Sequence, residues 1–446
     1  MNLKPYPKYK DSGIEWLGEV PEGWEVKKLK YSTKSATGFA FSSDDYMNDG
    51  VPLIRIGDIL ESGVVDIENA KKLPVEYAKL YGFAKINNND VLMAMTGATI
   101  GKAGRYLSSG IGLLNQRVCK FVPDSIFPDF LWFILKTSQY AEYIKLTGFG
   151  GAQPNISDKQ LLDFVAVLPP LPEQQAIATY LDQKTAKIDE LIKKNEKLLE
   201  LLKEKRQAII SHAVTKGLDP NAKMHVPVTE QGKDSGIDWI GEIPEGWGVK
   251  KLKYVAEIVL GKMLQNEDSG KDELKPYMRA QNIQWEIVDI TDVKEMWFSD
   301  YEIKKYRVQK GDLLISEGGE VGRTALWNGE LEECYIQNSV HKVTVDKKLA
   351  NNRYLLNLLK TYGKWGYFES IVNKVSIGHL TREKLKEIKI VCPPKNEQEQ
   401  IVTYLDKKSS SMDETIQKIQ PQIEKLKEYR QALISNVVTG KVRVTG

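Results

Sequence analysis

The chain has 446 residues and a net charge of +3, with 63 basic against 60 acidic side chains. That length allows two or three domains with cores of their own, and fractions of 41% apolar and 28% charged residues are typical of a soluble globular protein. The charge is too small to identify a nucleic-acid binder by itself. No membrane span or signal peptide is predicted, because no long apolar run occurs and the first residues are polar. Cys119, Cys334 and Cys392 lie far apart, which fits a reducing cytoplasm and offers no metal cluster.

A short arm occurs twice near the start of each half of the chain. Residues 10–24 read KDSGIEWLGEVPEGW, residues 233–247 read KDSGIDWIGEIPEGW, and VKKLKY follows both after one residue. Pro-Glu-Gly-Trp has the composition of a turn, because Pro presets φ and Gly admits a positive φ. We expect the tryptophans of both arms to hold them against the body of the protein: Trp16, Trp24, Trp239 and Trp247.

Two longer segments, residues 31–168 and 254–392, follow the arms and differ in sequence while keeping the same order of elements. Each has strand-like stretches on either side of a Gly-rich turn, which reads TGATIGKAGR from residue 96 and GGEVGRTAL from residue 318. A helix, a loop, a short helix and an apolar strand complete each copy. This alternation predicts a compact α/β or α+β domain with its topology left open. Ser157 followed by Gln160 predicts the capped start of the short helix.

Each segment leads into a long charged helix, at residues 169–217 and 393–441, and the two copies align without a gap at an offset of 224. Apolar residues at heptad spacing predict a coiled-coil seam between the copies, with an ordinary helix bundle as the alternative. One seam position is predicted to hold Leu181, Ile188, Asn195, Leu202 and Ile209, and in the second copy Leu405, Met412, Ile419, Leu426 and Leu433. The other seam position is predicted to hold Ile177, Leu191 and Leu198. Pro421 predicts a bend or break in the second helix near residues 417–421.

The predicted fold class is therefore α+β and multidomain. Two similar α/β domains are separated by two long antiparallel coiled-coil helices, as an internal repeat with pseudo-twofold symmetry. The predicted boundaries are an arm and first domain (1–168), a first long helix (169–217), a linker (218–231), an arm and second domain (232–392), and a second long helix with a tail (393–446). Duplex DNA has the same symmetry, so each domain could read its own half-site.

The arm ending in PEGW, the helix start PPLPEQQAIATYLD and the helix end KEKRQAIISHAVTKGL, all repeated, resemble the specificity subunit of type I restriction-modification enzymes. The resemblance covers essentially the whole chain. It implies two target-recognition domains that each read one half of a bipartite DNA site. It also implies helices that act as a spacer and dock two methyltransferase subunits, with restriction subunits joining that core. S-adenosylmethionine, ATP and Mg²⁺ would then belong to the partner subunits, and this chain would carry no cofactor.

Catalytic motifs are not found in the sequence. GATIGKA at residues 97–103 is one residue short of a phosphate-binding loop and lacks its hydroxyl. A tight turn that offers N–H groups and a basic side chain to a DNA phosphate, or a purely structural turn, are the alternatives kept. No adenine-methylation motif occurs, and the four histidines have no metal-ligand spacing. Asp129 and Asp182 could suggest a nuclease cluster, but the repeat partner Asp406 indicates that Asp182 belongs to the helix frame.

Candidate base-reading residues are the Arg, Lys, Asn, Gln and His residues in loops of the two domains, since these types recognise base edges. In the first domain they are Lys102, Arg105, Asn115, Gln116, Arg117 and Gln153, with Asn155 beside them. In the second they are Arg279, Gln281, Asn282, Arg323, Gln337, Asn338, Lys374 and His379. The first domain has 13 basic and 14 acidic residues and the second has 21 of each, so a DNA-binding face must be a local patch. We therefore expect weak DNA binding by the isolated chain.

Candidate docking residues for other subunits recur on both helices: Glu173, Gln174, Arg206, Gln207, Glu397, Gln398, Arg430 and Gln431. The favoured function is a non-catalytic DNA-specificity subunit that binds double-stranded DNA, methyltransferase subunits and restriction subunits in the cytoplasm. Two alternatives stay open. One is a coiled-coil adaptor that joins two proteins without binding DNA, and the other is an enzyme with divergent domains.

Overall fold

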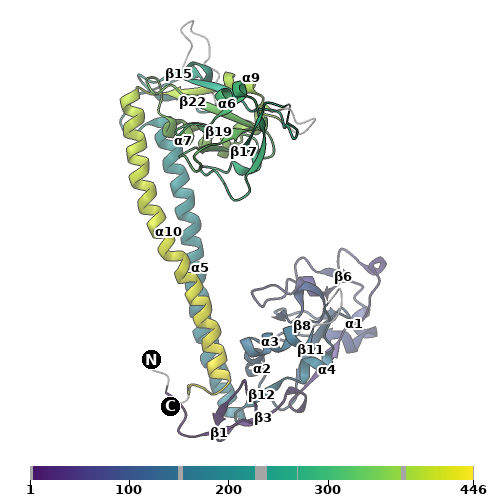
Figure 1. Ribbon diagram of the computed structural model, residues 1–446. Helices are drawn as coiled ribbons and strands as arrows, with labels where there is room; N and C mark the ends of the chain where they lie inside the picture. The colour runs from purple at the N-terminus through teal and green to yellow at the C-terminus, as the bar shows by residue number, and fades with distance from the viewer. Residues whose placement is uncertain (1–3, 149–153, 227–238, 269, 373–377, 445–446) are drawn as a thin grey trace. The chain divides into compact units, whose positions relative to one another are not determined.

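The computed structural model describes residues 4–148, 154–226, 239–268, 270–372 and 378–444 (Figure 1). The chain forms two compact units: residues 1–196 and 420–446 form unit 1, and residues 197–419 form unit 2. Two long helices, α5 (Leu171–Lys216) and α10 (Lys395–Val438), belong partly to each unit. Each unit therefore contains one mixed α and β domain, the start of one long helix and the end of the other. The two domains are called recognition domains below, after the role that the resemblance implies.

The recognition domain of unit 1 is built on two small sheets. One is antiparallel, in the order β4-β11-β8-β9, and the other has the order β6-β5-β10-β7 with β5 and β10 parallel. The strands of the first sheet are β4 (Thr33–Thr37), β8 (Val91–Ala94), β9 (Ala103–Arg105) and β11 (Val118–Pro123). Those of the second are β5 (Val51–Ile54), β6 (Lys71–Leu73), β7 (Lys85–Ile86) and β10 (Gly112–Leu114). β3 (Glu25–Lys28) pairs with β12 (Val165–Leu168), so the strands that lead into and out of the domain lie together.

The helices of unit 1 are α1 (Tyr77–Leu80), α2 (Pro128–Leu135), α3 (Ser138–Thr147) and α4 (Asp158–Leu162). Pro128 stands at the first position of α2, where a missing N–H costs nothing. Thr137 caps α3 by accepting a hydrogen bond from the Tyr140 N–H. The predicted capping box at α4 is confirmed, because the side chains of Ser157 and Gln160 each accept a backbone N–H of the other residue.

Unit 2 repeats this arrangement. Its antiparallel sheet has the order β16-β22-β19-β20, its second sheet has the order β18-β17-β21 with β17 and β21 parallel, and β15 pairs with β23. The strands are β15 (Gly248–Lys251), β16 (Ala256–Leu260), β17 (Glu273–Met278), β18 (Lys294–Phe298), β19 (Leu313–Ser316), β20 (Thr324–Leu326), β21 (Tyr335–Ile336), β22 (Val340–Val345) and β23 (Lys389–Cys392). The helices are α6 (Asp300–Tyr306), α7 (Asn352–Lys364), α8 (Tyr367–Ile371) and α9 (Arg382–Glu387). The predicted repeat of two mixed α and β domains is thus confirmed in the pairing of the strands.

A glycine at the same point of both domains shows how closely the backbones repeat. A Cβ on Gly38 would lie 1.9 Å from the carbonyl oxygen of Leu114, and a Cβ on Gly261 would lie 2.4 Å from that of Gln337. No side chain fits at such distances. Both recognition domains therefore need glycine where the first strand of one sheet passes the end of the parallel pair in the other.

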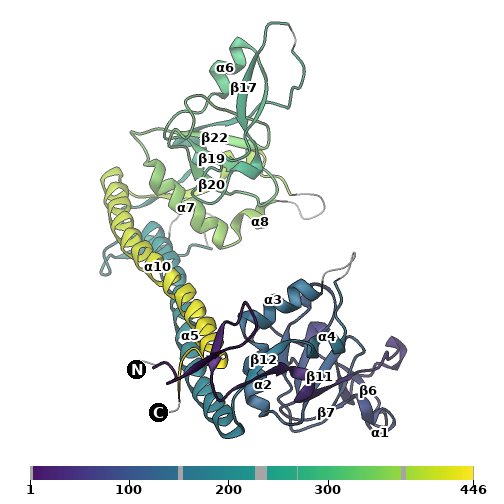
Figure 2. The ribbon, with the colours of Figure 1, turned by 60° about the horizontal axis from the view of Figure 1, so that its bottom comes forward.

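The hydrophobic core of each unit includes the ends of both long helices. In unit 1, Ile177 and Leu181 of α5 and Val437 of α10 pack in one cluster with Phe130 and Tyr140 of the recognition domain. In unit 2, Val214 of α5 and Leu405 of α10 pack with residues of α7 in the same way. Figures 1 and 2 both show α5 and α10 side by side. The recognition domains are thus part of the cores that hold the helix ends together.

The seam of the helix pair confirms one predicted position and corrects the other in part. Leu181, Ile188 and Leu405 of the first position are buried as predicted, and so is Ile177 of the second. Leu191 and Leu198 of the second position are 50% and 43% exposed. The buried or partly buried side chains lie one residue later in the heptad: Ala178, Thr185, Ile192, Leu199, Arg206 and Ala213 in α5, and Val402, Ser409, Ile416, Ile423, Arg430 and Val437 in α10. The prediction was wrong because Leu191-Ile192 and Leu198-Leu199 are adjacent apolar pairs, and either member fits a heptad.

Pro421 does not break α10, which is a continuous helix from Lys395 to Val438. Its ring is exposed, while Ile419 and Ile423 beside it are buried. Burial of these neighbours offsets the lost backbone hydrogen bond, so the predicted break was wrong.

Each arm contributes a strand to a short antiparallel pair. β1 (Tyr9–Asp11) pairs with β2 (Glu19–Pro21), and β13 (Met224–His225) pairs with β14 (Ile243–Pro244). β13 lies inside the stretch predicted as a linker, which therefore contributes a strand to unit 2. The two ends of the described chain meet in unit 1, where the Arg443 N–H donates to the Lys4 carbonyl. Among the described residues, no helix is long and apolar enough to cross a membrane.

Candidate nucleic-acid interface

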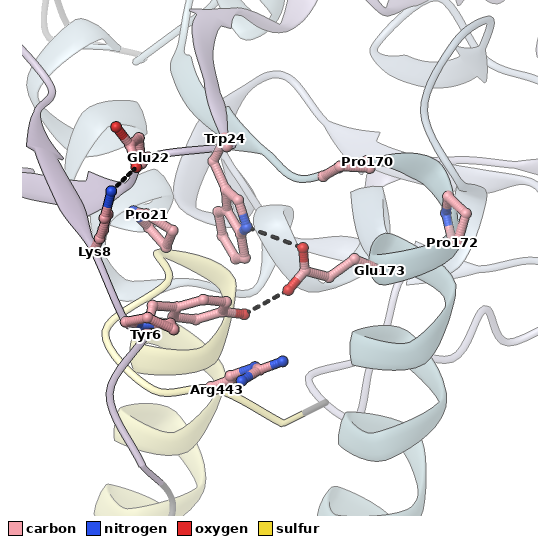
Figure 3. Close-up of a pocket in the computed structure, with 11 residues that line it drawn as sticks. Tyr6, Lys8, Pro21, Glu22, Trp24, Pro170, Pro172, Glu173 and Arg443 are labelled. Atoms are coloured by element: carbon pink, nitrogen blue, oxygen red, sulfur yellow. Dashed lines mark hydrogen bonds and ion pairs between the residues drawn. The ribbon is translucent and has the colours of Figure 1, made fainter. Parts of the chain in front are cut away.

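A glutamate at the start of each long helix binds the tryptophan of an arm, and Figure 3 shows the pair of unit 1. Trp24 Nε1 donates to Glu173 Oε2 at 3.1 Å, and Tyr6 donates its hydroxyl to Glu173 Oε1 at 2.8 Å. In unit 2, Trp247 Nε1 donates to Glu397 Oε2 at 3.0 Å. Tyr6, Trp24 and Glu173 line a cavity of about 570 Å³ in unit 1, and their polar side-chain atoms are bonded to one another. We interpret this cavity as a structural joint rather than a binding site.

The other arm tryptophans also pack against their own units. The Trp16 ring stacks on Phe164 with centroids 5.7 Å apart, and the Trp239 ring stacks on Tyr367 at 4.4 Å. The predicted role of the four tryptophans as anchors is thus confirmed by their contacts.

The glutamine that follows each glutamate is buried and bonded within the chain. Gln174 accepts the Phe127 N–H at 2.8 Å and donates to the Pro169 carbonyl at 2.8 Å. Gln398 accepts the Asn351 N–H at 2.8 Å and donates to the Pro393 carbonyl at 2.9 Å. Each amide joins the helix start to the residue that precedes α2 or α7. A buried amide cannot contribute to an exposed docking face, so the docking prediction for these two residues is corrected.

Replacement of Gln174 by Ala should destabilise unit 1 by about 1–3 kcal/mol, because it leaves the Phe127 N–H without its acceptor. Gln175 is the next residue and is exposed, so Gln175→Ala is a matched control that should change stability by no more than about 0.5 kcal/mol. Thermal unfolding of the full chain measures both. Equal melting temperatures for the two variants would contradict the assigned role.

The recurring arginines lie in the seam and pair with aspartates of the opposite helix. Arg430 Nε lies 2.7 Å from Asp189 Oδ1 in unit 1, and Arg206 Nε lies 3.8 Å from Asp413 Oδ1 in unit 2. Both members of each pair are separated from their counterparts by 224 residues, so the pairs are reciprocal. They are direct signs of the antiparallel arrangement, because the start of each helix meets the end of the other.

The glutamines after these arginines lie at the junction with the recognition domains. Gln431 Nε2 donates to the Lys136 carbonyl at 2.8 Å, and Gln207 Nε2 donates to Ser211 Oγ at 3.1 Å, which lies 3.4 Å from Thr361 Oγ1. All eight predicted docking residues thus have partners inside the chain. Docking of other subunits at the six that are not fully buried stays a prediction.

The candidate base-reading side chains of the first domain differ in exposure and in whether they already form an ion pair. Lys102 forms a 2.7 Å ion pair with Glu61, and Arg105 pairs with Asp129 at 2.9 Å while lying 4.8 Å above the Trp132 ring. Gln116 and Arg117 are exposed, and Asn115 Oδ1 accepts the Arg117 N–H. Gln153 lies outside the described residues. Gln116 and Arg117 are therefore the most accessible of these candidates.

In the second domain, two candidates bind one carboxylate and a third candidate is buried. Arg279 Nη2 and Gln281 Nε2 donate to Asp292 at 2.8 and 3.1 Å. Asn282 is buried and donates to the carbonyls of Asp289 and Asp292, so it supports the loop and cannot contact DNA, which corrects that prediction. Arg323 is held by Gln284 and by the Ala280 carbonyl at 3.0 Å each.

The remaining candidates of the second domain lie at the end of β21 and beyond α8. Gln337 donates to Asn338 Oδ1 at 2.6 Å and accepts from Ser339, and both amides are partly exposed. His379 is exposed, and its ring lies about 3.5 Å from the position of a Cβ on Gly318 in the Gly-rich turn. Lys374 lies outside the described residues.

The Gly-rich turn of the first domain uses its backbone donors internally. The N–H groups of Gly97, Gly101 and Lys102 donate to the carbonyls of Pro154, Ala94 and Thr99. Gly97 and Gly101 have φ of +71° and +80°, which explains why glycine is needed at both points. Of the predicted contributions to a DNA phosphate, these three N–H groups already have acceptors, and the basic side chain of Lys102 pairs with the exposed Glu61.

Sequence reasoning missed a group of aromatic side chains beside Gln116 and Arg117. The ring of Phe39 lies 4.8 Å from that of Tyr81 and 6.3 Å from that of Phe83, and Phe39 and Phe83 are exposed. The Phe39 carbonyl accepts the Gln116 N–H. Exposed aromatic rings next to amide and guanidinium groups suit stacking on bases or insertion between base steps. The FAF and YGF triplets at residues 39–41 and 81–83 were the available signal.

Among the described residues, no group of three or more His, Cys, Asp or Glu side chains is placed to hold a metal ion. The positions of Asp129 and Asp182 indicate that these residues belong to the junction between the domain and the long helix. Their repeat counterparts, Arg353 and Asp406, form a bidentate ion pair with both contacts at 2.6 Å.

Comparison with known proteins agrees with this architecture of two recognition domains on a helix pair. A family model described as type I restriction modification DNA specificity domain matches residues 21–201 and again residues 244–425. The EcoBI specificity subunit of Escherichia coli is 24% identical over 442 residues, which cover 97% of this chain and 89% of the relative. The MjaIX specificity subunit of Methanocaldococcus jannaschii is also 24% identical, over 96% of this chain and 95% of the relative.

Two solved structures share the fold. A chain from a study of complex assembly and conformational transition of the type I R-M system matches with a TM-score of 0.68 at 18% identity, covering 94% of this chain and 98% of that one. The HsdS subunit from Thermoanaerobacter tengcongensis matches with a TM-score of 0.51 at 18% identity, covering 95% and 98%.

The molecule is thus a DNA-specificity protein that contains the same recognition unit twice. The chain belongs to the type I restriction-modification DNA specificity family, whose model matches both of its halves. This membership decides against a coiled-coil adaptor without DNA binding and against an enzyme with divergent domains, because the family supplies the recognition subunits of these systems.

Proposed function

We propose that each recognition domain reads one half of a bipartite DNA site while α5 and α10 set the distance between the halves. The proposal rests on the contrast between the contacts that hold each domain on the helices, which repeat, and the exposed loop residues, which differ. The reciprocal Arg–Asp pairs and the buried glutamines recur in both units, whereas exposed residues such as Gln116 and Gln281 have no identical counterparts in the other domain. Two domains that are held by the same contacts but carry different exposed loops suit a DNA site whose two halves have different bases.

The proposal includes two methyltransferase subunits on the helices, with restriction subunits joining the complex. Those subunits would bind S-adenosylmethionine, ATP and Mg²⁺ and carry out adenine methylation and cleavage. A cytoplasmic location agrees with three free, buried cysteines. Because neither recognition domain has a marked basic excess, partner subunits would supply a large share of the phosphate contacts.

The test is methylome sequencing of a host that carries this chain with its modification subunits. We expect one motif with two different halves at a fixed spacing. Gln116→Ala with Arg117→Ala should relax the bases of one half only, since each lost bidentate contact is worth about 1–3 kcal/mol of discrimination. Gln281→Ala is the matched change in the other domain and should affect the other half only. A motif without two independent halves would overturn the proposal.

A further inference from the structure

The two repeats place a lysine at the same point, where the recognition domain meets the long helix; it is partly buried in unit 1 and buried in unit 2. These are Lys136 after α2 and Lys360 in α7, which are separated by 224 residues. The residues around them correspond as well, because Arg430 and Arg206 come from the long helix in each unit. The charge balance at this junction differs between the units.

In unit 2 the lysine is neutralised by a carboxylate from the recognition domain. Lys360 Nζ lies 2.5 Å from Glu286 Oε2, Arg206 Nη1 lies 3.6 Å from the same atom, and the Lys360 side chain is only 7% exposed. Glu286 has a φ of 71°, which is unfavourable for a residue with a side chain. The surrounding contacts must offset that strain, and the two ion pairs are the contacts that hold the side chain.

In unit 1 a glycine stands where Glu286 stands in unit 2. Gly63 has a φ of +82° and lies in a turn that the Ile59–Val65 bridge closes. The turn of Glu286 is closed in the same way by the Ile283–Val288 bridge. A Cβ on Gly63 would lie 3.0 Å from Lys136 Nζ. The nearby carboxylate, Glu61, is 88% exposed and forms its ion pair with Lys102 at 2.7 Å.

Lys136 has neutral partners and cationic neighbours. Its ammonium donates to the Ala103 carbonyl at 2.9 Å and lies 4.4 Å from the centre of the Trp132 ring. Burial and the charge of Arg430 lower the pKa of Lys136 to about 8, with Glu61 opposing them. The junction of unit 1 thus holds a partly buried ammonium group that forms no ion pair with a carboxylate of the described residues, whereas Lys360 in unit 2 pairs with Glu286.

A cavity of about 540 Å³ opens beside this lysine. It lies between the Gly-rich turn and the first turns of α3 and is lined by Lys102, Lys136 and Lys145 together with the hydroxyl residues Thr99 and Ser138. Glu61 and Glu142 also line it, so cationic side chains are in excess. The cavity is large enough for a tetrahedral anion.

We propose that this cavity in unit 1 binds a phosphate group of the DNA backbone next to the half-site read by the first domain. The phosphate would supply Lys136 with the counter-charge that Glu286 supplies to Lys360 in unit 2. Lysines and hydroxyl groups around a concave site suit phosphate oxygens, which accept several hydrogen bonds at once. The site rests on the proposed function, and it adds that the two domains hold DNA unequally.

The first test is a titration of the full chain with inorganic phosphate, followed by ³¹P line broadening. Wild type should bind phosphate. Lys136→Met removes the cation, and Gly63→Glu supplies an internal carboxylate at a position whose φ already matches that of Glu286. Both variants should lose the binding. Retained binding in Gly63→Glu, with the chain folded, would overturn the proposal.

The second test is the salt dependence of duplex binding by the complex with modification subunits. Loss of one phosphate contact should lower the slope of log K against log salt by about 0.9 without changing the base preference. Lys360→Met with Glu286→Gln is the matched control in unit 2 and should leave the slope unchanged. An unchanged slope with weakened subunit assembly would mean that a partner's carboxylate occupies the site, which overturns the proposal. If the wild-type complex bound no duplex specifically, the proposed function would fail, and the phosphate titration alone would decide on the site.

Discussion

Exchange of residues 31–168 for the matching domain of another family member should replace one half of the methylated motif and leave the other half unchanged. The exchanged stretch begins after β3 and ends with β12. These two strands pair with each other, so the two ends of the stretch lie close together in the native fold. The effect should be all or none, because every base-reading candidate of the first domain lies inside this stretch. Methylome sequencing of a host carrying the chimera measures it.

The chimera must keep the contacts that hold the domain on α10. Ser138 Oγ lies 3.1 Å from Ser435 Oγ, and Gln431 donates to the Lys136 carbonyl, so a donor domain with Ser or Thr at the first position and the same helix length is the suitable choice. Exchange of residues 254–392 is the matched control and should change the opposite half. A change in both halves, or in neither, would mean that the domains do not read independently.

The repeat explains why much of the fold could be predicted from one sequence. Motifs with local causes were correct, such as the Ser157–Gln160 capping box and the turn that presents Trp24 to the helix start. The long helices were predictable because heptad spacing extends over many turns. The identity of one seam position was not, since Leu191 and Ile192 are equally apolar and only the packing of the opposite helix selects between them.

The candidate site was harder to predict because its residues depend on distant partners. Asn282 has the composition of a base reader, yet its amide is used by carbonyls seven and ten residues away. Gln174 and Gln398 recur like a docking motif, but they recur because each binds the N–H of the residue that precedes α2 or α7 in its own unit. Repetition within a chain therefore marks a shared physical need, and only the structure shows whether that need is internal.

The reciprocal ion pairs place useful limits on any change in helix length. Arg430 and Asp189 both belong to unit 1, and Arg206 and Asp413 both belong to unit 2. An insertion after Leu202 in α5 and another after Leu426 in α10 separates no member of either pair from its partner. The ion pair between Lys427 and Glu196 is also kept, since both residues lie on the unit 1 side of the insertions.

One heptad added at each of these two points should lengthen the spacer of the recognised motif by about three base pairs. Seven residues at about 1.5 Å each add about 10 Å to both helices and keep the seam in register. B-DNA rises about 3.4 Å per base pair, and three pairs turn the duplex by roughly a third of a turn. That rotation should lower the methylation rate, while the bases of both halves stay the same because no reading residue moves within its domain.

Insertion of five residues at the same two points is the control. Five residues rotate the helix by about 140° at 3.6 residues per turn, which turns the apolar seam away from its partner and should abolish assembly. Methylome sequencing of hosts carrying each variant gives the spacer and the bases together. If the heptad variant methylated the original spacing at full efficiency, α5 and α10 would not set the distance between the half-sites, and the arms would have to do so.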